Sequence, residues 1–223
     1  MPLDVERIVT AVDTAGWSPV DVEYGEASLR VLLPPHDVCR MGHAEVLKNP
    51  RREISRALRQ PTGSPPLEEV LRAASPRKPM GEKVVAITVS DITRPVPYRG
   101  EGGILPLLLT ALEAVGVRRS NVRIVVGTGM HRPSTHDERV RMFGEEVVSG
   151  GYMLADHDCR DSYNLVHVGR TRRGADVSVN RLFAEADVRI TTGLVESHFM
   201  AGASGGRKGV CPALMDYRSI SAF

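Results

Sequence analysis

Two histidines and one lysine stand beside glycine-rich segments in the C-terminal half of this sequence. His131 ends the segment GTGMH, and the run FMAGASGGR separates His198 from Lys208. Imidazole titrates near neutral pH, so a histidine that follows a sharp glycine turn is suited to general acid–base catalysis. A lysine amine can pair with a phosphate or act as a nucleophile. The competing interpretations are a structural histidine and a flexible glycine loop with a solvated Arg–Lys pair.

The glycines near Lys208 indicate how a ligand could approach the backbone. Ser204, Gly205 and Gly206 offer main-chain N–H groups that can form a nest for an anion. A P-loop requires Ser or Thr directly after its lysine, whereas Gly209 follows Lys208 here. The GTGMHR segment likewise lacks the last glycine of the dinucleotide fingerprint. The sequence therefore predicts an anion site of neither standard nucleotide-binding type.

The segment SDITRPVP supplies a third group of polar residues. Asp91 and Arg94 follow a predicted strand, and two prolines stiffen what comes next. Arginine binds phosphate through two parallel N–H bonds, and the Thr93 hydroxyl adds one donor. Asp91 would orient the arginine or bind a ribose hydroxyl. A surface loop with an internal Asp–Arg pair is the alternative.

Strand and helix patterns alternate along the C-terminal two-thirds of the chain. KVVAITVSD and VRIVVG are typical of buried strands, ILPLLLTALEAVG and STHDERVRMFG of helices, and ADVSVNRLFAEADVRITTGLV of strand, short helix and strand. Ser134 or Thr135 is the expected cap of the second helix. This alternation predicts an α/β layered domain with a largely parallel sheet flanked by helices. The polar motifs follow strands, where the carboxyl ends of such a sheet form the ligand crevice.

The first 80 residues predict further elements before this domain. VERIVTAVDTAG has the apolar spacing of a helix, and VDVEY and SLRVLLPP flank Gly25-Glu26 as an N-terminal β-hairpin. A helical segment then falls into two pieces, AEVLKNPRREISRALRQ and PLEEVLRAA, which the proline-rich PTGSPP separates.

Composition excludes several classes of function. The 223 residues carry a net charge of +2 and only 4% aromatics, so neither a basic field nor a stacking platform for nucleic acid is present. No apolar stretch reaches the length of a membrane span, and the N-terminus lacks a signal-peptide pattern. Three widely spaced cysteines favour reduced thiols and a cytoplasmic protein.

The segment LADHDCRD raises the question of a metal site. His157, Cys159 and Asp161 all carry ligating atoms, but their spacing matches no common zinc pattern. A turn between two strands is the preferred interpretation. The remaining histidines are interpreted as surface or structural residues: His36, His43, His136 and His167.

Taken in order, these motifs resemble the nickel-dependent lactate racemase family. The matching pieces are SDITRPVP, GTGMHRPST with Glu138, HDCRD before a strand, and VNRLFAEADVRITTGLVESHFMAGASGGRKGV. ALRQPTGSPPLEEVLR also resembles the helix–turn–helix region of the family. The likeness covers most of positions 20–212. Each motif alone is weak, but their joint order and spacing are specific.

The resemblance implies a cofactor and assigns roles to the motifs. The cofactor is a nickel-pincer nucleotide, a pyridinium mononucleotide whose thioamide and thioacid chelate nickel. Lys208 matches the lysine that forms the thioamide link, and His131 and His198 match two catalytic histidines. The cofactor-binding turn corresponds to Asp91, Ile92, Thr93 and Arg94.

In the mechanism that the resemblance implies, one histidine takes the hydroxyl proton of a small 2-hydroxy acid. The α-hydride moves to the pyridinium ring and leaves a 2-keto acid, which rotates and takes the hydride back on its other face. The second histidine returns the proton. The implied activity is racemisation or epimerisation of lactate-like 2-hydroxy acids.

The sequence also departs from the family pattern. The nickel-ligating histidine is expected about sixteen residues after the lysine, just past Phe223, so no metal ligand is assigned within this chain. Cys211-Pro212-Ala213 replaces the usual Pro-Gly. We expect residues 1–223 to form the N-terminal cofactor-binding domain of a two-domain racemase, with the C-terminal domain as its partner, and the isolated fragment to be inactive.

Two other functions compete with the racemase. One is a non-catalytic module that binds a phosphate-bearing cofactor through Arg94 and the glycine loop. The other is a metal hydrolase that uses His131, His157 and His198 directly as ligands.

Overall fold

The computed structural model describes residues 13, 15–35, 45–199 and 201–222. The chain divides into two compact units, residues 1–46 and 47–223. The predicted helix VERIVTAVDTAG falls almost entirely outside the described residues, as do His36, His43 and Cys39. Within the part that is described, no helix is both long and apolar enough to cross a bilayer.

The first unit contains the predicted hairpin. Strands β1 (Ser18–Tyr24) and β2 (Ala27–Leu33) pair antiparallel around a two-residue turn at Gly25-Glu26. Gly25 has φ +63°, a conformation that glycine adopts without a steric penalty. Arg30 on β2 pairs with Asp21 on β1 at 2.8 Å. The hairpin prediction is confirmed.

A four-stranded parallel sheet forms the centre of the second unit. Its strands are β3 (Val85–Ser90), β4 (Val122–Gly127), β5 (Met153–Asp156) and β8 (Val188–Thr191), in the order β5-β4-β3-β8. Most residues of the two central strands, β3 and β4, are buried, as expected where both faces of a sheet are covered. The α/β fold with a largely parallel sheet is confirmed.

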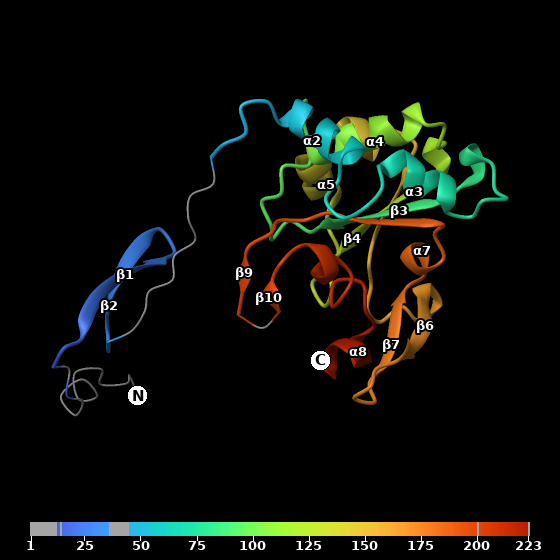
Figure 1. Cartoon of the computed structure of the whole chain (residues 1–223). Coiled ribbons are helices and arrows are strands. Elements are labelled where there is room, and N and C mark those ends of the chain that lie inside the picture. Colours follow the sequence, from blue (N-terminus) through green and yellow to red (C-terminus); the bar gives the residue numbers. More distant parts are fainter. Residues whose placement is uncertain (1–12, 14, 36–44, 200, 223) are drawn as a thin grey trace. The chain divides into compact units, whose positions relative to one another are not determined.

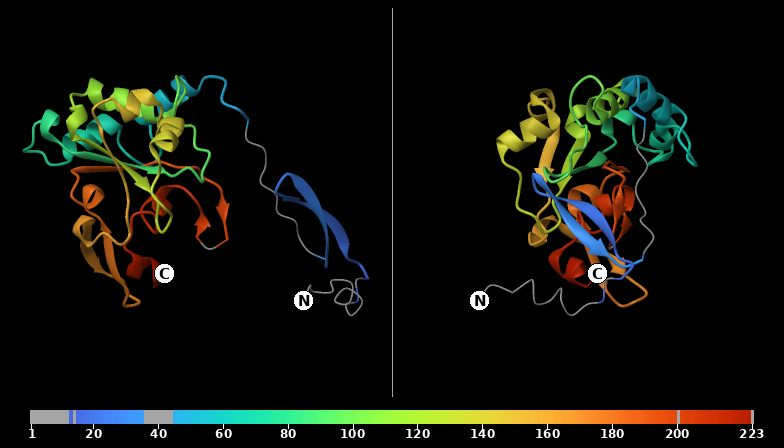
Figure 2. Two further views of the ribbon diagram at one scale, coloured as in Figure 1. Left: turned by 180° about the vertical axis from the view of Figure 1, so that it is seen from behind. Right: turned by 90° about the vertical axis from the view of Figure 1, so that its left-hand side faces the viewer.

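Alternate residues of these strands enter two separate cores. Val85, Ile87 and Val89 pack against a layer of helices, whereas Ala86 faces a second cluster that includes Leu214. Figure 1 shows α2, α3, α4 and α5 on one side of the sheet and α7, β6, β7 and α8 on the other. Figure 2 shows the same two layers from two further directions. The helices of the first layer are α2 (Pro50–Arg59), α3 (Leu67–Ala73), α4 (Ile104–Ala114), α5 (His136–Phe143) and α6 (Glu145–Val148).

Polar side chains cap the ends of two helices in this layer. Lys83 is buried, and its Nζ donates to the carbonyls of Leu71, Arg72 and Ala74 at 2.6, 3.2 and 2.5 Å, so it caps the C-terminus of α3. At the start of α5, the side chain of Thr135 and that of Glu138 form a capping box. Thr135 is therefore the cap, and Ser134 is not.

The second layer differs from the prediction in one respect. Strand β7 (Asp176–Asn180) does not join the parallel sheet but pairs antiparallel with β6 (Leu165–Arg170) in a ribbon of its own. Its sequence DVSVN alternates polar and apolar residues, which is typical of an antiparallel strand with one covered face, whereas central parallel strands are continuously apolar. Two short helices and one hairpin complete the layer. They are α7 (Arg181–Ala184), α8 (Tyr217–Ser221) and the hairpin of β9 (Ser197–His198) with β10 (Gly202–Ala203).

Candidate functional site

A cavity of about 250 Å³ opens at the carboxyl ends of β3, β4 and β8. This edge is where ligands bind in open α/β sheets. The volume is slightly below the roughly 300–1,000 Å³ typical of small-molecule sites. The cavity therefore suits one end of a larger ligand. Its polar lining residues are Ser90, Asp91, Thr93, Arg94, Thr128, His131, Thr192, Ser204 and Lys208.

The turn after β4 is shaped by a loop that returns from the far end of the chain. A Cβ atom on Gly127 would lie 2.9 Å from the Cβ of Ala213, closer than two carbons can approach. The N–H of Gly129, at φ +57°, donates to the carbonyl of Ala213 at 3.0 Å. The N–H of His131 then donates to the carbonyl of Thr128 at 2.9 Å. The glycines let this turn pack against Ala213 and place His131 at the cavity.

This packing gives a stability prediction. We expect Gly127→Ala to lower the free energy of unfolding by about 1–3 kcal/mol, because the new methyl group overlaps the Ala213 side chain. The double variant Gly127→Ala/Ala213→Gly should recover part of the loss. Urea unfolding monitored by circular dichroism tests both variants. Equal stability of Gly127→Ala and the parent would contradict the contact.

His131 forms a carboxylate–imidazole pair with Asp91. Its Nδ1 lies 2.6 Å from Asp91 Oδ2; the Asp91 side chain is 9% exposed and the His131 ring 60%. The other Asp91 oxygen accepts bonds from the N–H and the hydroxyl of Thr93. Asp91 therefore acts as an acceptor on both oxygens, which favours a proton on Nδ1 of His131. Nε2 of the neutral ring is then left as the basic nitrogen.

Only part of the predicted cofactor-binding turn lies at the cavity. Asp91, Thr93 and Arg94 line the cavity, whereas the side chain of Ile92 packs against the core of the helical layer. Ile92 can therefore contribute only its backbone to a ligand. Arg94 Nη1 pairs with Glu196 Oε1 at 3.0 Å.

The glycine-rich loop contributes the other cation. Ser204, Gly205 and Lys208 line the cavity, and Gly206 does not. Gly205 has φ +72°, and a Cβ there would lie 3.0 Å from the carbonyl oxygen of Leu194, so the position requires glycine. Lys208 lies in a short 3₁₀ turn whose first bond runs from its N–H to the carbonyl of Gly205. Arg94 and Lys208 thus reach the cavity from two separate segments.

His198 lies on β9, outside the residues that line the cavity. Its Nδ1 accepts a bond from the N–H of Ala201 at 3.2 Å, and its ring stacks on that of Phe199 at 5.2 Å between centroids. With Nδ1 accepting, the neutral ring carries its proton on Nε2. The hydrogen bonds thus favour opposite tautomers for the two histidines.

The segment LADHDCRD begins in β5, and its residues from 157 on form the predicted turn before β6. His157 is buried: Nε2 contacts the carbonyl of Met215 at 2.9 Å, and Nδ1 faces the Asn180 amide at 3.2 Å. Among the described residues, no three His, Cys, Asp or Glu side chains gather as a metal site. The geometry therefore does not favour the directly ligated hydrolase.

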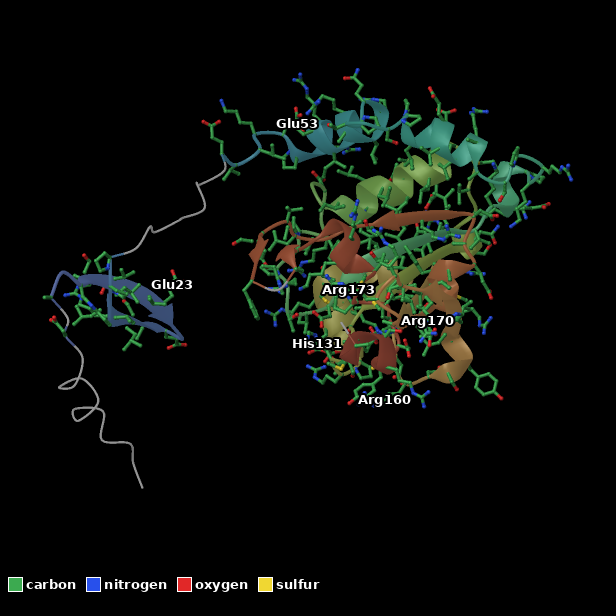
Figure 3. All side chains as sticks on the ribbon, turned by 60° about the horizontal axis from the view of Figure 1, so that its bottom comes forward. Glu23, Glu53, His131, Arg160, Arg170 and Arg173 are labelled. Carbon is green, nitrogen blue, oxygen red and sulfur yellow. The ribbon has the colours of Figure 1, made fainter. Side chains whose placement is uncertain are left out.

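The turn after His157 also contacts the last helix. Figure 3 shows Arg160 beside α8, where its guanidinium lies 4.3 Å from the Tyr217 ring centroid.

Burial gives His157 a pH-dependent contribution to stability. Desolvation lowers its pKa below 6.5, although Met215, Asp158 and Asp216 act in the opposite direction. Because the folded state binds this proton less readily than the unfolded state, the contribution is complete above about pH 6.5 and falls as the pH drops. We expect the free energy of unfolding to decrease from pH 7.5 to pH 5, and His157→Gln to reduce that slope. Identical slopes in urea titrations would contradict this.

Several lining residues were absent from the predicted site. Thr128, Met130, Pro212, Ala213 and Ile220 line the cavity. Of these, only Thr128 and Met130 had a signal in the sequence, because they lie inside the GTGMH turn. The other three come from a loop and a short helix that no local pattern connects to this edge. The pairing of Asp91 with His131 was also missed, although both follow adjacent strands.

Comparison with known proteins shows the family to which this chain belongs. The family model described as the lactate racemase N-terminal domain matches residues 24–223. The chain belongs to this family. It is 40% identical over 169 residues to a lactate racemase from Lactiplantibacillus plantarum, covering 76% of this chain and 37% of that protein. A lactate racemase from Thermoanaerobacterium thermosaccharolyticum is 33% identical over 208 residues, covering 91% of this chain and 46% of the relative.

Solved structures give the same result for the fold. The lactate racemase apoprotein from Thermoanaerobacterium thermosaccharolyticum matches with a TM-score of 0.72 at 33% identity, over 92% of this chain and 46% of that chain. A crystal structure of a protein from Thermotoga maritima matches with a TM-score of 0.59 at 18% identity, over 79% of this chain and 41% of the other, and supports the fold alone. The chain spans less than half the length of these relatives. The resemblance to lactate racemases is thus confirmed at the level of the family.

Proposed function

We propose that this chain is the cofactor-holding part of a racemase or epimerase for small 2-hydroxy acids. The observation that carries the proposal is the Asp91–His131 pair, whose 2.6 Å contact stands at a cavity that also holds Arg94 and Lys208. A module that only bound a phosphate would need the two cations but no oriented imidazole. The lactate racemase names of the relatives support a 2-hydroxy acid as substrate.

The residues of the cavity fit one end of a nickel-pincer nucleotide. Arg94 can neutralise a phosphate, and the Lys208 amine can attack a carboxylate-derived group. A Cβ at Gly205 would lie 3.0 Å from the carbonyl oxygen of Leu194, so glycine lets the loop pack closely against this segment at the edge of the cavity. We propose that Lys208 forms the covalent link and that Asp91, Thr93, Arg94 and the Ser204–Gly206 loop hold the nucleotide. When bound, this cofactor would supply the acceptor and donor of the substrate's α-hydride.

The two histidines would then move the hydroxyl proton. Nε2 of His131, with Nδ1 held by Asp91, takes the proton from the substrate hydroxyl as the α-hydrogen departs with its electron pair. His198, as an imidazolium, would return a proton from Nε2 to the substrate oxygen when the α-carbon is reduced on its other face. In each direction the neutral imidazole acts as the base and an imidazolium as the acid, and the roles exchange for the other enantiomer. The nickel-ligating histidine just past Phe223 and the C-terminal partner domain belong to the same proposal.

The direct test is interconversion of enantiomers by the complete protein, made together with the enzymes that synthesise the cofactor. We expect either enantiomer of lactate, or of another small 2-hydroxy acid, to be converted to the racemate in a chiral chromatography assay. Binding of the nucleotide without racemisation of any 2-hydroxy acid in a panel would favour the binding module.

Asp91→Asn separates orientation of the base from cofactor binding. The amide can donate to Nδ1, which would stabilise the wrong tautomer of His131. We expect kcat to fall about 100-fold or more, by analogy with triads in which the carboxylate fixes the histidine tautomer. Nickel content and bound cofactor should remain close to the parent level, because the proposed link to Lys208 and the contacts of Thr93 and Arg94 remain. Loss of the cofactor in this variant would mean that Asp91 acts mainly by holding the nucleotide and not by orienting His131.

A further inference from the structure

Glu196 contacts the predicted anion-binding arginine from outside the cavity. Arg94 lines the cavity, and its Nη1 lies 3.0 Å from Oε1 of Glu196, which is not among the lining residues. Both side chains are about one-third exposed, at 38% and 31%. Exposed ion pairs of this kind contribute little to stability. We therefore expect the contact to affect the orientation of the Arg94 guanidinium more than the stability of the fold.

The backbone that carries Glu196 is itself fixed. Its N–H donates to Ser204 Oγ at 3.1 Å, and its carbonyl accepts the Ser204 N–H at 2.9 Å. Ser204 is buried, and its hydroxyl donates to the carbonyl of Leu194 at 2.7 Å. The carboxylate of Glu196 thus extends from a fixed point on the segment that leads into β9. Arg94 is held just as firmly at its backbone, where its N–H donates to the carbonyl of Asp91.

We propose that Glu196 is a positioning residue that presents Arg94 to the anionic end of the ligand. A guanidinium has five N–H donors, and the Glu196 contact occupies one nitrogen. The Glu196 carboxylate restricts the rotamers of Arg94. The remaining N–H donors of the guanidinium can then form a bidentate bond to a phosphate. This inference rests on the proposed function, because it names Arg94 as the anion ligand. The opposing role would be a counter-ion that competes with the ligand for Arg94.

The same contact joins two segments of the site. Arg94 belongs to the turn after β3, which also supplies Asp91 for His131. Glu196 lies two residues before His198, on the segment that Ser204 ties to the glycine-rich loop. The Arg94–Glu196 contact therefore links the anion site to the segment that leads to His198. Tyr98 and Thr192, whose hydroxyls lie 3.0 Å apart, form a second tie between these segments.

Calorimetric titration with nicotinic acid mononucleotide, and separately with inorganic phosphate, tests the proposal on the apo form of the complete protein. We expect Glu196→Ala to weaken binding about 5- to 10-fold, because the freed arginine must be ordered on binding. Glu196→Gln keeps an acceptor at Oε1 and should lose less than about threefold. In an Arg94→Ala background, Glu196→Ala should have no further effect. Thermal melting of each variant checks that the fold is unchanged.

The outcomes distinguish this inference from the function on which it rests. Tighter binding by Glu196→Ala or Glu196→Gln would overturn positioning and make Glu196 a competing counter-ion. An equal loss with and without Arg94 would overturn it as well. If inorganic phosphate follows the expected pattern while the mononucleotide does not bind, Glu196 still positions Arg94 and the proposed cofactor fails. Binding that does not depend on Arg94 would overturn the inference directly.

Discussion

His131→Ala in the complete, cofactor-loaded protein is expected to reduce kcat for lactate racemisation about 10²- to 10⁴-fold, the usual contribution of a general acid–base group. The imidazole that Asp91 orients would be lost, while Arg94 and Lys208 would still hold the cofactor. Initial rates from each enantiomer, measured by chiral chromatography, give the effect in both directions. Nickel content should be unchanged.

His198→Ala and His167→Ala complete this experiment. His198→Ala should lose activity to a similar extent in both directions, because each direction needs one base and one acid. His167 lies exposed on β6 and away from the cavity, so His167→Ala is the matched control and should keep the parent rate. Parent-level racemisation by both His131→Ala and His198→Ala would exclude the proposed roles.

Lys208→Ala is expected to abolish covalent attachment of the cofactor. The complete protein, made with the cofactor-synthesis enzymes, should carry the mass increment of a modified pyridinium mononucleotide and about one nickel per chain. The variant should lack both, because no other lysine lines the cavity among the described residues. Intact-protein mass spectrometry and metal analysis give the two values.

Two further variants show which property of Lys208 matters. Lys208→Arg keeps the charge but lacks the nucleophilic amine, so we expect it to lose the mass increment as well. Arg207→Ala, at the exposed neighbouring position, should keep both the increment and the nickel. Nickel without any mass increment in the parent protein would limit Lys208 to contact with the phosphate.

The fold was predictable where apolar patterns decide it. The buried runs at β3 and β4 and the helical pattern of α4 predict a parallel sheet with covered faces, and the structure confirms them. The ribbon of β6 and β7 was not predictable, because alternation of apolar and polar residues indicates one covered face but does not identify the partner strand. Their partners depend on packing between distant segments.

The candidate site was predictable only in part for a related reason. Motifs that follow strands identify Asp91, Arg94 and His131 as neighbours of one crevice. The hydrogen bond between Asp91 and His131 depends on the register of β3 with β4, in which Ser90 lies opposite Gly127, and no local pattern gives this register. Ala213 is separated from the GTGMH turn by more of the sequence than Asp91 is. Its contact with Gly127 forms only in the folded chain.

The most direct test of the account uses lactate with deuterium at its α-carbon. In the proposed mechanism, His131 and His198 move only the hydroxyl proton, and the bound cofactor would supply the acceptor and donor of the α-hydride. The complete, loaded protein should therefore convert deuterated L-lactate in ordinary water to D-lactate that retains the deuterium, as mass spectrometry would show. Exchange of the deuterium for solvent hydrogen would mean that a histidine removes the α-hydrogen as a proton, and would contradict the account.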